Sequence, residues 1–315
     1  MADMTDTVTT PGSGTDPGVR RFRSPLRTVP SLRVIARYAG LVPFVAYVAI
    51  FLIVPLVAIA AGAFQNPTTG AFTWSNVNIA THGVYAEGFR QSIELSLLAS
   101  VIPGVFGLLI AYAIFTARGR GGSFLRQVVL TASGVLANFG GVPLAFLFIA
   151  SLGSTALVTG WLSDIGLNIY NLGFSLYTMS GVALVYMYFQ IPLMVLIFLP
   201  ALEGLRPAWR EAAENMGARS WHYWRHVGGP VLLPSFLSCL MLLFGSALAA
   251  YATAEALTTG TIPLTSIQIG SFLNGNVIAG QENVGQALSL GMVLIIAVLM
   301  IFYVLLQRRA AKWLR

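Results

Sequence analysis

The densest group of chemistry-bearing side chains lies in residues 211–230, E-A-A-E-N-M-G-A-R-S-W-H-Y-W-R-H-V-G-G-P. Glu211 and Glu214 are three residues apart, which places both carboxylates on one face of a helix. Because the two alanines between them let another backbone approach closely, this face suits an Arg or Lys of a partner protein. His222 and His226 are four apart and could form a metal pair. The acidic residue of the H-E-x-x-H zinc motif is absent, however, so surface histidines are the preferred interpretation.

Motifs for enzymatic chemistry are missing from the rest of the sequence. There is neither a G-x-S-x-G motif nor a cysteine cluster, and the single cysteine, Cys239, excludes an intramolecular disulfide. The chain has one lysine, Lys312, in A-A-K-W-L-R, so it cannot contain the G-x-x-x-x-G-K-[ST] loop that binds nucleotide phosphates. We therefore expect no enzyme activity, and neither a cofactor nor a metal held by this chain.

The composition predicts an all-α membrane protein. Of the 315 residues, 56% are hydrophobic and 9% are charged, against about 25% charged in soluble domains. Uncharged runs longer than the roughly 20 residues that cross a bilayer recur along the chain, and lipid favours helices because each must satisfy its own backbone. The predicted spans are 39–63, 91–115, 127–151, 174–199, 230–254 and 283–306.

The basic residues predict the orientation of these six spans. Of the 18 Lys and Arg, 17 fall on one side, and only Arg90 falls opposite. Lys and Arg concentrate in cytoplasmic segments, so we expect both termini, and residues 203–230 between spans four and five, to face the cytoplasm. The net charge of +7 is spread over four short segments, which favours contact with anionic lipid over nucleic acid.

The expected domains are a disordered basic tail (1–37), a six-helix membrane domain (38–309) and a short basic tail (310–315). Within the segment between spans four and five, Pro207 suits a first helical position and Gly217 a helix end. Ser220 is expected to cap a second short helix. Gly228, Gly229 and Pro230 are expected to break it before span five.

The spacing of this segment resembles the "EAA" loop of ABC-importer permeases, the inner-membrane subunits of binding-protein-dependent uptake systems. The family pattern is E-A-A, three residues, G, nine residues, I, any residue, L-P, before the penultimate span. Here Val227 stands for the Ile and Gly229 for the Leu. The resemblance covers about residues 85–307. The texts E-A-A-E-N-M-G-A and N-F-G-G-V-P-L-A-F look most like the spermidine/putrescine-type branch.

The resemblance implies a cytoplasmic coupling helix that docks on a separate ATPase. Its docking contacts would be Glu211, Ala212, Ala213 and Gly217. The implied partners are two cytosolic ATPases that hold ATP and Mg, a second, related permease and an extracytoplasmic solute-binding protein. The implied location is a bacterial cytoplasmic membrane.

Polar residues inside spans are costly and often functional, which gives the candidate solute-pathway residues. They are Glu94, Asn138, Gln190, Tyr251 and Glu255. The N-F-G-G-V-P stretch 138–143 and Gln190-Ile191-Pro192 predict broken helices near mid-membrane, although a packing kink is the alternative at both places. Glu94 and Glu255 are either solvated at headgroup level or form an acidic outer mouth for a cation.

The predicted solute is a spermidine/putrescine-like cation. A sugar, with Tyr186, Tyr188 and Tyr251 as stacking surfaces, is the alternative within the family, as is a small anion. A secondary transporter without an ATPase, or a structural scaffold, are the alternatives outside it.

Overall fold

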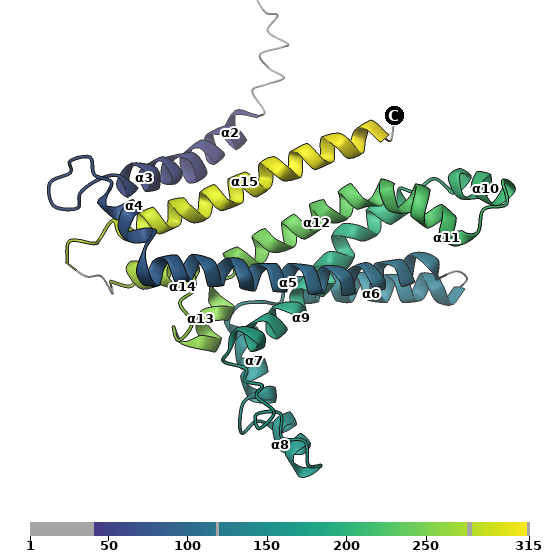
Figure 1. The fold of residues 1–315 in the computed structure, drawn as a ribbon, viewed down its shortest axis with the longest axis horizontal. Coiled ribbons are helices and arrows are strands. Elements are labelled where there is room, and N and C mark those ends of the chain that lie inside the picture. Colours follow the sequence, from purple (N-terminus) through teal and green to yellow (C-terminus); the bar gives the residue numbers. More distant parts are fainter. Residues whose placement is uncertain (1–40, 118–119, 276–278, 314–315) are drawn as a thin grey trace, which may run out of the picture. The chain divides into compact units, whose positions relative to one another are not determined.

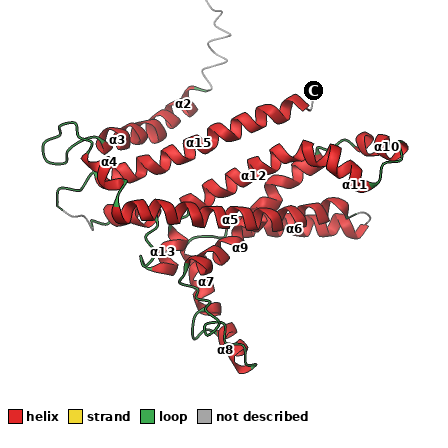
Figure 2. Cartoon of the chain, viewed as in Figure 1, coloured by secondary structure: helices red, strands yellow, loops and turns green. Residues whose placement is uncertain are grey.

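The computed structural model describes residues 41–117, 120–275 and 279–313, and within these ranges the secondary structure is helical (Figure 2). One isolated bridge, between Gln65 and Phe72, is the exception. The predicted tail 1–37 and Arg118 of the basic segments lie outside the described residues. Of the predicted tail 310–315, residues up to Trp313 continue the last helix, and 314–315 lie outside the description.

The described chain forms two compact units that divide between Val54 and Pro55. The first contains α2 (Val42–Val48) and a π-helical turn, η1 (Ala49–Ile53). Their side chains are apolar and largely exposed, as expected of a helix that faces lipid. With α3 (Val54–Ala63) they make up the first candidate span, Val42–Ala63.

The second unit contains the other helices (Figure 1). They are α4 (Ser75–Ala80), α5 (Gly83–Thr116), α6 (Arg120–Asn138), α7 (Val142–Leu152), α8 (Leu157–Asp164), α9 (Met179–Glu203), α10 (Pro207–Asn215), α11 (Ser220–Tyr223), the π-helical turn η2 (Trp224–Gly228), α12 (Gly229–Ala249), α13 (Ala252–Thr258), α14 (Thr265–Leu273) and α15 (Val284–Trp313).

The long helix α5 organises this unit because one of its faces carries small residues. The buried members of this stripe are Gly88, Ser92, Ser96, Ala99, Ser100, Gly104, Gly107 and Ala111. Small residues let membrane helices approach closely where lipid supplies no hydrophobic driving force. A Cβ at Gly107, for example, would lie 2.5 Å from the Cβ of Met194 on α9. Helices α9 and α12 pack on this face, α6 lies beside α9, and α15 lies against α12.

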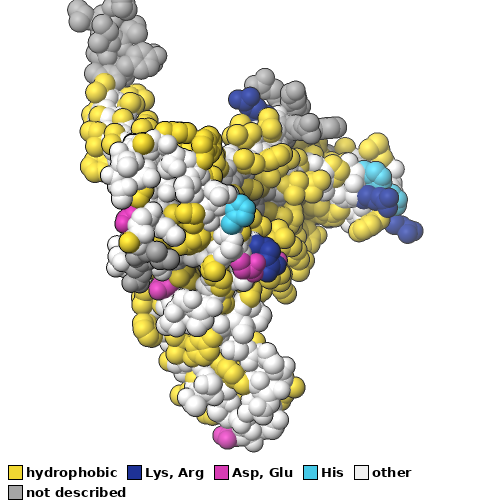
Figure 3. Space-filling model, turned by 60° about the vertical axis from the view of Figure 1, so that its left-hand side comes forward, with side chains coloured by type: hydrophobic (Ala, Val, Ile, Leu, Met, Phe, Trp, Pro, Cys, Tyr) yellow, Lys and Arg dark blue, Asp and Glu magenta, His cyan; other side chains and the backbone are white. Residues whose placement is uncertain are grey.

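Six helical segments are long and apolar enough to cross a membrane, and the chain is a multi-pass membrane protein. They are Val42–Ala63, Gly83–Thr116, Val142–Asp164, Met179–Glu203, Ser220–Ala249 and Val284–Arg308. The predicted number is confirmed among the described residues. Figure 3 shows hydrophobic side chains over much of the visible face, with charged side chains gathered in a few places.

The third predicted span, 127–151, is wrong in its boundaries. The chain breaks between Asn138 and Val142, and the apolar candidate runs through α7 and α8 instead, from Val142 to Asp164. Arg126, Gln127, Thr131 and Ser133 make α6 much less apolar than α7. Helices α7 and α8 leave the direction of α6 after the break (Figure 1).

Helix α9 also differs from the prediction, because it runs without interruption through Pro192 and Pro200. The expected break at Gln190-Ile191-Pro192 is therefore wrong. A proline removes one backbone hydrogen bond, which a helix packed on several sides tolerates. A break occurs instead on α12, which ends at Ala249 and is followed by the separate helix α13.

Candidate functional site

The segment 203–230 folds around the short helix α10, whose two ends follow the sequence-based expectation. Pro207 occupies the first turn, and the helix ends in a left-handed turn at Gly217, with φ of 78°. The Gly217 amide donates to the Glu214 carbonyl at 2.9 Å, and the Ala218 amide to the Ala213 carbonyl at 3.0 Å. These two bonds form a Schellman motif, which satisfies carbonyls that the helix end leaves free.

The second half of this segment differs from the prediction. Arg219, not Ser220, precedes the first helical residue, and no side chain caps that helix. Gly228 and Gly229 do not interrupt the helix, since α11, η2 and α12 follow one another without a gap. A Cβ at Gly228 would lie 2.7 Å from a ring carbon of Trp224, so these glycines make room for a bulky side chain. The π-helical turn absorbs the extra residue in the helical run.

The two glutamates of α10 have different surroundings. Glu214 accepts a hydrogen bond from Arg210 Nε at 2.9 Å, and the two form an exposed ion pair one turn apart. Glu211 is exposed and has no ion pair or side-chain hydrogen bond among the described residues. The carboxylate open to another protein is therefore Glu211. Of the two alanines, Ala212 is exposed and Ala213 is buried.

Two exposed apolar side chains follow Glu211 in this segment. Met216 is 81% exposed and Trp221 is 69% exposed. Sequence reasoning missed both as contact residues, although a Met and a Trp beside charged residues in a short polar segment were a usable signal. We call the exposed residues Glu211, Ala212, Met216 and Trp221 of this segment the α10 surface. Such a combination suits a protein partner that carries a basic residue.

The two histidines lie one turn apart and are exposed. The His222 and His226 rings stack with centroids 6.3 Å apart, and His226 Nδ1 lies 3.0 Å from the His222 carbonyl. Among the described residues, no group of three or more potential metal ligands includes them. Their exposure is consistent with surface histidines.

Two interrupted helices meet deeper in the second unit. The α6–α7 break contains Gly141, whose φ of 78° and ψ of −153° suit glycine alone. The α12–α13 break lies at Ala250 and Tyr251. Thr253 on α13 accepts a hydrogen bond from the Gly141 amide at 2.9 Å and lies 3.3 Å from the Gly141 carbonyl. The two breaks are thus joined through one hydroxyl.

Two buried side chains of α9 complete the polar contacts around the second break. The Tyr186 hydroxyl donates to the Ala250 carbonyl at 2.6 Å, where the end of α12 leaves that carbonyl without a helical partner. Gln190, which is fully buried, donates from Nε2 to the Leu243 carbonyl at 2.9 Å. Its Oε1 has no partner among the described atoms. A buried polar atom without a partner costs about 1–3 kcal/mol. A polar group of a solute that donated a hydrogen bond to this oxygen would recover that free energy.

Three of the predicted pathway residues lie at or beside these breaks. Asn138 ends α6 and donates to the Gly134 carbonyl of its own helix at 2.9 Å. Tyr251 is half-buried, and its ring packs against Gly270. A Cβ added at Gly270 would lie 2.6 Å from a carbon of this ring. Glu255 is half-buried on α13, and its Oε2 has no hydrogen-bond partner. The predicted break at 138–143 is confirmed, and it lies beside α13.

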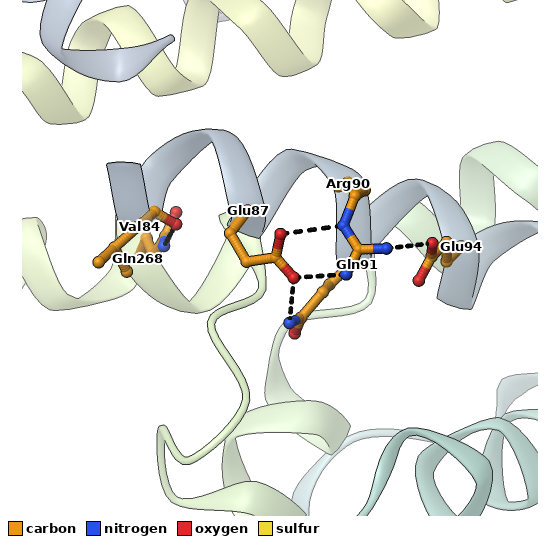
Figure 4. A network of polar contacts seen from close by, with 6 residues as sticks. All are labelled: Val84, Glu87, Arg90, Gln91, Glu94 and Gln268. Carbon is orange, nitrogen blue, oxygen red and sulfur yellow. Dashed lines mark hydrogen bonds and ion pairs between the residues drawn. The ribbon is translucent and has the colours of Figure 1, made fainter. Parts of the chain in front are cut away.

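Glu94 lies in a separate polar network along α5 (Figure 4). Arg90 bonds Glu94 at 2.6 Å and Glu87 through two nitrogens, at 2.9 and 2.6 Å, and Gln91 donates to Glu87 at 2.7 Å. No hydrogen bond or ion pair among the described residues joins Glu94 to Glu255. Because Arg90 bonds both Glu87 and Glu94, these three side chains together keep one net negative charge, and the acidic outer mouth expected from Glu94 and Glu255 stays a prediction.

The tyrosines proposed as a stacking surface for a sugar do not act together. Tyr186 is fully buried, with its hydroxyl engaged at Ala250, so it cannot present a ring to a solute. Tyr188 packs edge-on against Phe139 and Phe148, with centroids 6.4 and 5.8 Å apart. Thr253 was missed, and Tyr186 was named only as a stacking surface, because no motif marks a threonine or tyrosine that bonds an interrupted backbone.

Known proteins resemble this chain over much of its length, although no protein-family model matches it. The sulfate transport system permease protein CysT of Escherichia coli (strain K12) is 26% identical over 199 residues, 63% of this chain and 66% of that protein. The probable sulfate permease protein cysT of Nephroselmis olivacea is 24% identical over 221 residues, 70% and 72% of the two chains. The E. coli thiamine transport system permease protein ThiP is 28% identical over 195 residues, and the match spans only 32% of its length.

Solved structures share the fold. A chain of a bacterial ABC transporter involved in the import of the acidic polysaccharide alginate superimposes with a TM-score of 0.69 at 20% identity, covering 89% of this chain and 96% of that one. The same transporter in complex with an alginate pentasaccharide-bound periplasmic protein gives 0.68. The fold is therefore that of an ABC-importer chain, and the similarities support the resemblance to ABC-importer permeases. They give no support to the spermidine/putrescine branch.

Proposed function

We propose that this chain is the permease subunit of an ATP-driven importer. It forms the solute path and receives movement from a separate ATPase through α10. The α10 surface carries this proposal: a helix closed by the Gly217 turn presents an unpaired Glu211, and exposed Met216 and Trp221 follow it in the same segment. The family pattern places the ATPase contact at this segment, and the geometry leaves it open to a partner.

The rest of the assembly follows from the same proposal. Two cytosolic ATPases hold ATP and Mg, a second and related permease completes the membrane part, and a solute-binding protein delivers the solute from outside. A periplasmic binding protein accompanies the alginate transporter that shares this fold. The α10 surface faces the cytoplasm of a bacterial cell, and both termini lie on that side.

The transported solute is proposed to be a small solute other than a polyamine. The similar proteins are named for sulfate and thiamine, which favours these solutes over a polyamine. The path is proposed to run past the two interrupted helices, where Glu255 and Gln190 keep polar oxygens without partners. One carboxylate and one amide oxygen are the kind of few, placed polar groups that orient a solute in a binding site. Sulfate and thiamine are the first solutes to assay, with spermidine as the comparison.

The test compares two glutamates that differ in their surroundings. The complex with its co-purifying subunits is placed in proteoliposomes with the binding protein. Glu211→Gln should lower uptake and binding-protein-stimulated ATP hydrolysis at least tenfold, because truncating one partner of a desolvated charge pair costs about 2–5 kcal/mol. Glu214→Gln, which removes a carboxylate already paired with Arg210, should change both much less. Equal effects of the two variants, or normal uptake by Glu211→Gln, would refute the coupling assignment.

A further inference from the structure

An apolar cavity of about 230 Å³ lies between α5, α9, η2 and α12. Its walls are Leu108, Tyr112, Phe198, Leu202, Trp224, Gly229, Leu232, Leu233 and Phe236. Phe198 and Leu202 are buried and form the floor, whereas Leu233 is 55% exposed and Tyr112 is 37% exposed at the mouth. At a liquid volume of ~30 Å³ per water the space would hold about eight waters, but its lining offers them almost no polar partners. An apolar occupant therefore suits it better.

The cavity lies beside the ends of two spanning helices. Tyr112 is one turn before the end of α5 at Thr116, and Leu202 is next to the end of α9. Gly229 lies at the junction of η2 and α12, inside the continuous helical run Ser220–Ala249. The Tyr112 and Trp224 rings meet edge-on, with centroids 5.3 Å apart. Tyrosine and tryptophan gather at this level of a bilayer, where hydrocarbon meets the headgroups.

The charged residues beside the cavity leave an excess of positive charge. Two ion pairs, Arg126 with Glu203 and Arg210 with Glu214, neutralise four of the charges at this end. The charged side chains that remain in the described segment are Arg206, Arg219, Arg225 and Glu211, all exposed. The hydrogen bond to Glu214 raises the pKa of the Arg210 guanidinium, which therefore stays charged within this ion pair.

We infer that this cavity binds one acyl chain of an anionic phospholipid, whose phosphate lies among the arginines of the α10–η2 segment. Arg225, which is exposed and follows Trp224 in the chain, is the arginine nearest in sequence to the cavity wall. An amphiphile fits this place because an apolar cavity beside the ends of spanning helices adjoins a segment with an excess of positive charge. The site does not depend on which solute is transported.

Brominated lipid gives a direct test because Trp224 lines the cavity. The complex is reconstituted in phosphatidylcholine nanodiscs with rising fractions of dibrominated phosphatidylglycerol or dibrominated phosphatidylcholine. The fluorescence of Trp224 is taken as the difference between wild type and Trp224→Phe. We expect half-maximal quenching by the anionic lipid at a mole fraction about fivefold lower than by the neutral one, the effect of one basic residue near a membrane surface.

Matched variants separate a site from general attraction to the bilayer. Arg225→Gln should remove most of the preference, whereas Arg308→Gln, on α15, should keep it. Leu108→Phe, which fills the cavity, should retain less phosphatidylglycerol in mass spectra of the intact complex than Leu109→Phe, an exposed neighbour outside the lining. This second readout holds if Trp224→Phe does not assemble. Equal quenching by both lipids, equal effects of the two arginines, or no quenching of Trp224, which would mean that protein covers the cavity, would each overturn the inference.

Discussion

The Thr253 hydroxyl holds Gly141 at both its amide, 2.9 Å away, and its carbonyl, 3.3 Å away. One side chain thereby joins two helix breaks that are 112 residues apart in the sequence. Gly141 begins α7 and Thr253 belongs to α13, and these two short helices pack together. A movement of α12 towards or away from α9 would therefore be passed to α7.

Thr253→Val should weaken this joint while keeping the shape of the side chain. The Gly141 amide would lose its partner in a partly buried place, at about 1–3 kcal/mol. We expect a lower thermal midpoint of the purified complex and reduced uptake, and Thr253→Ser should restore both. Thr258→Val is the control, because that hydroxyl bonds only the Ala254 carbonyl of its own helix. A Thr253→Val complex that matches the Thr258→Val complex in both measurements would contradict the role of the joint.

Tyr186→Phe should loosen the end of α12. It removes the hydroxyl that bonds the Ala250 carbonyl and leaves that carbonyl buried without a donor, at about 1–3 kcal/mol. The thermal midpoint should fall, and protease should reach the 250–252 connection more readily. Tyr188→Phe is the comparison, since the Tyr188 hydroxyl makes no hydrogen bond to the described residues and its ring contacts would remain. If both variants melt together with wild type, the hydroxyl does not hold the break.

Gln190→Leu distinguishes a structural amide from one that meets solute. Replacing the half-satisfied amide by an apolar group of similar size removes the orphaned Oε1 together with the bond to Leu243, and such exchanges are nearly neutral for stability. We therefore expect an unchanged or higher thermal midpoint. If solute uses Oε1, uptake falls severalfold at the same time. A loss of stability with unchanged uptake would assign Gln190 to packing alone.

The sequence allowed the number of spans and the α10 turn to be predicted for clear physical reasons. Apolar runs longer than a bilayer have few alternatives to helix, and the Gly217 position needs a positive φ that glycine adopts freely. Gly140 and Gly141 likewise marked the break after Asn138. In each case one residue type or one run length was enough.

The second break could not be predicted in this way. Ala250 and Tyr251 are neither Gly nor Pro, and the break is stabilised by Tyr186 and Thr253, which are remote in sequence. Pro192 gave the opposite error, since α9 remains helical through it. The pairing of Arg90 with Glu94 follows from four-residue spacing and could have been predicted.

Gly217→Ala should damage coupling through the backbone rather than through a lost contact. No atom lies within 4 Å of where its Cβ would be, so the change adds no clash. The left-handed conformation at φ of 78° costs a non-glycine residue about 1–2 kcal/mol. The α10 turn should fray, and uptake and stimulated ATP hydrolysis should fall together while the complex stays assembled. Gly217→Asn, which tolerates this conformation, should recover most of both, and an alanine variant as active as the asparagine one would show that the turn geometry does not matter for transport.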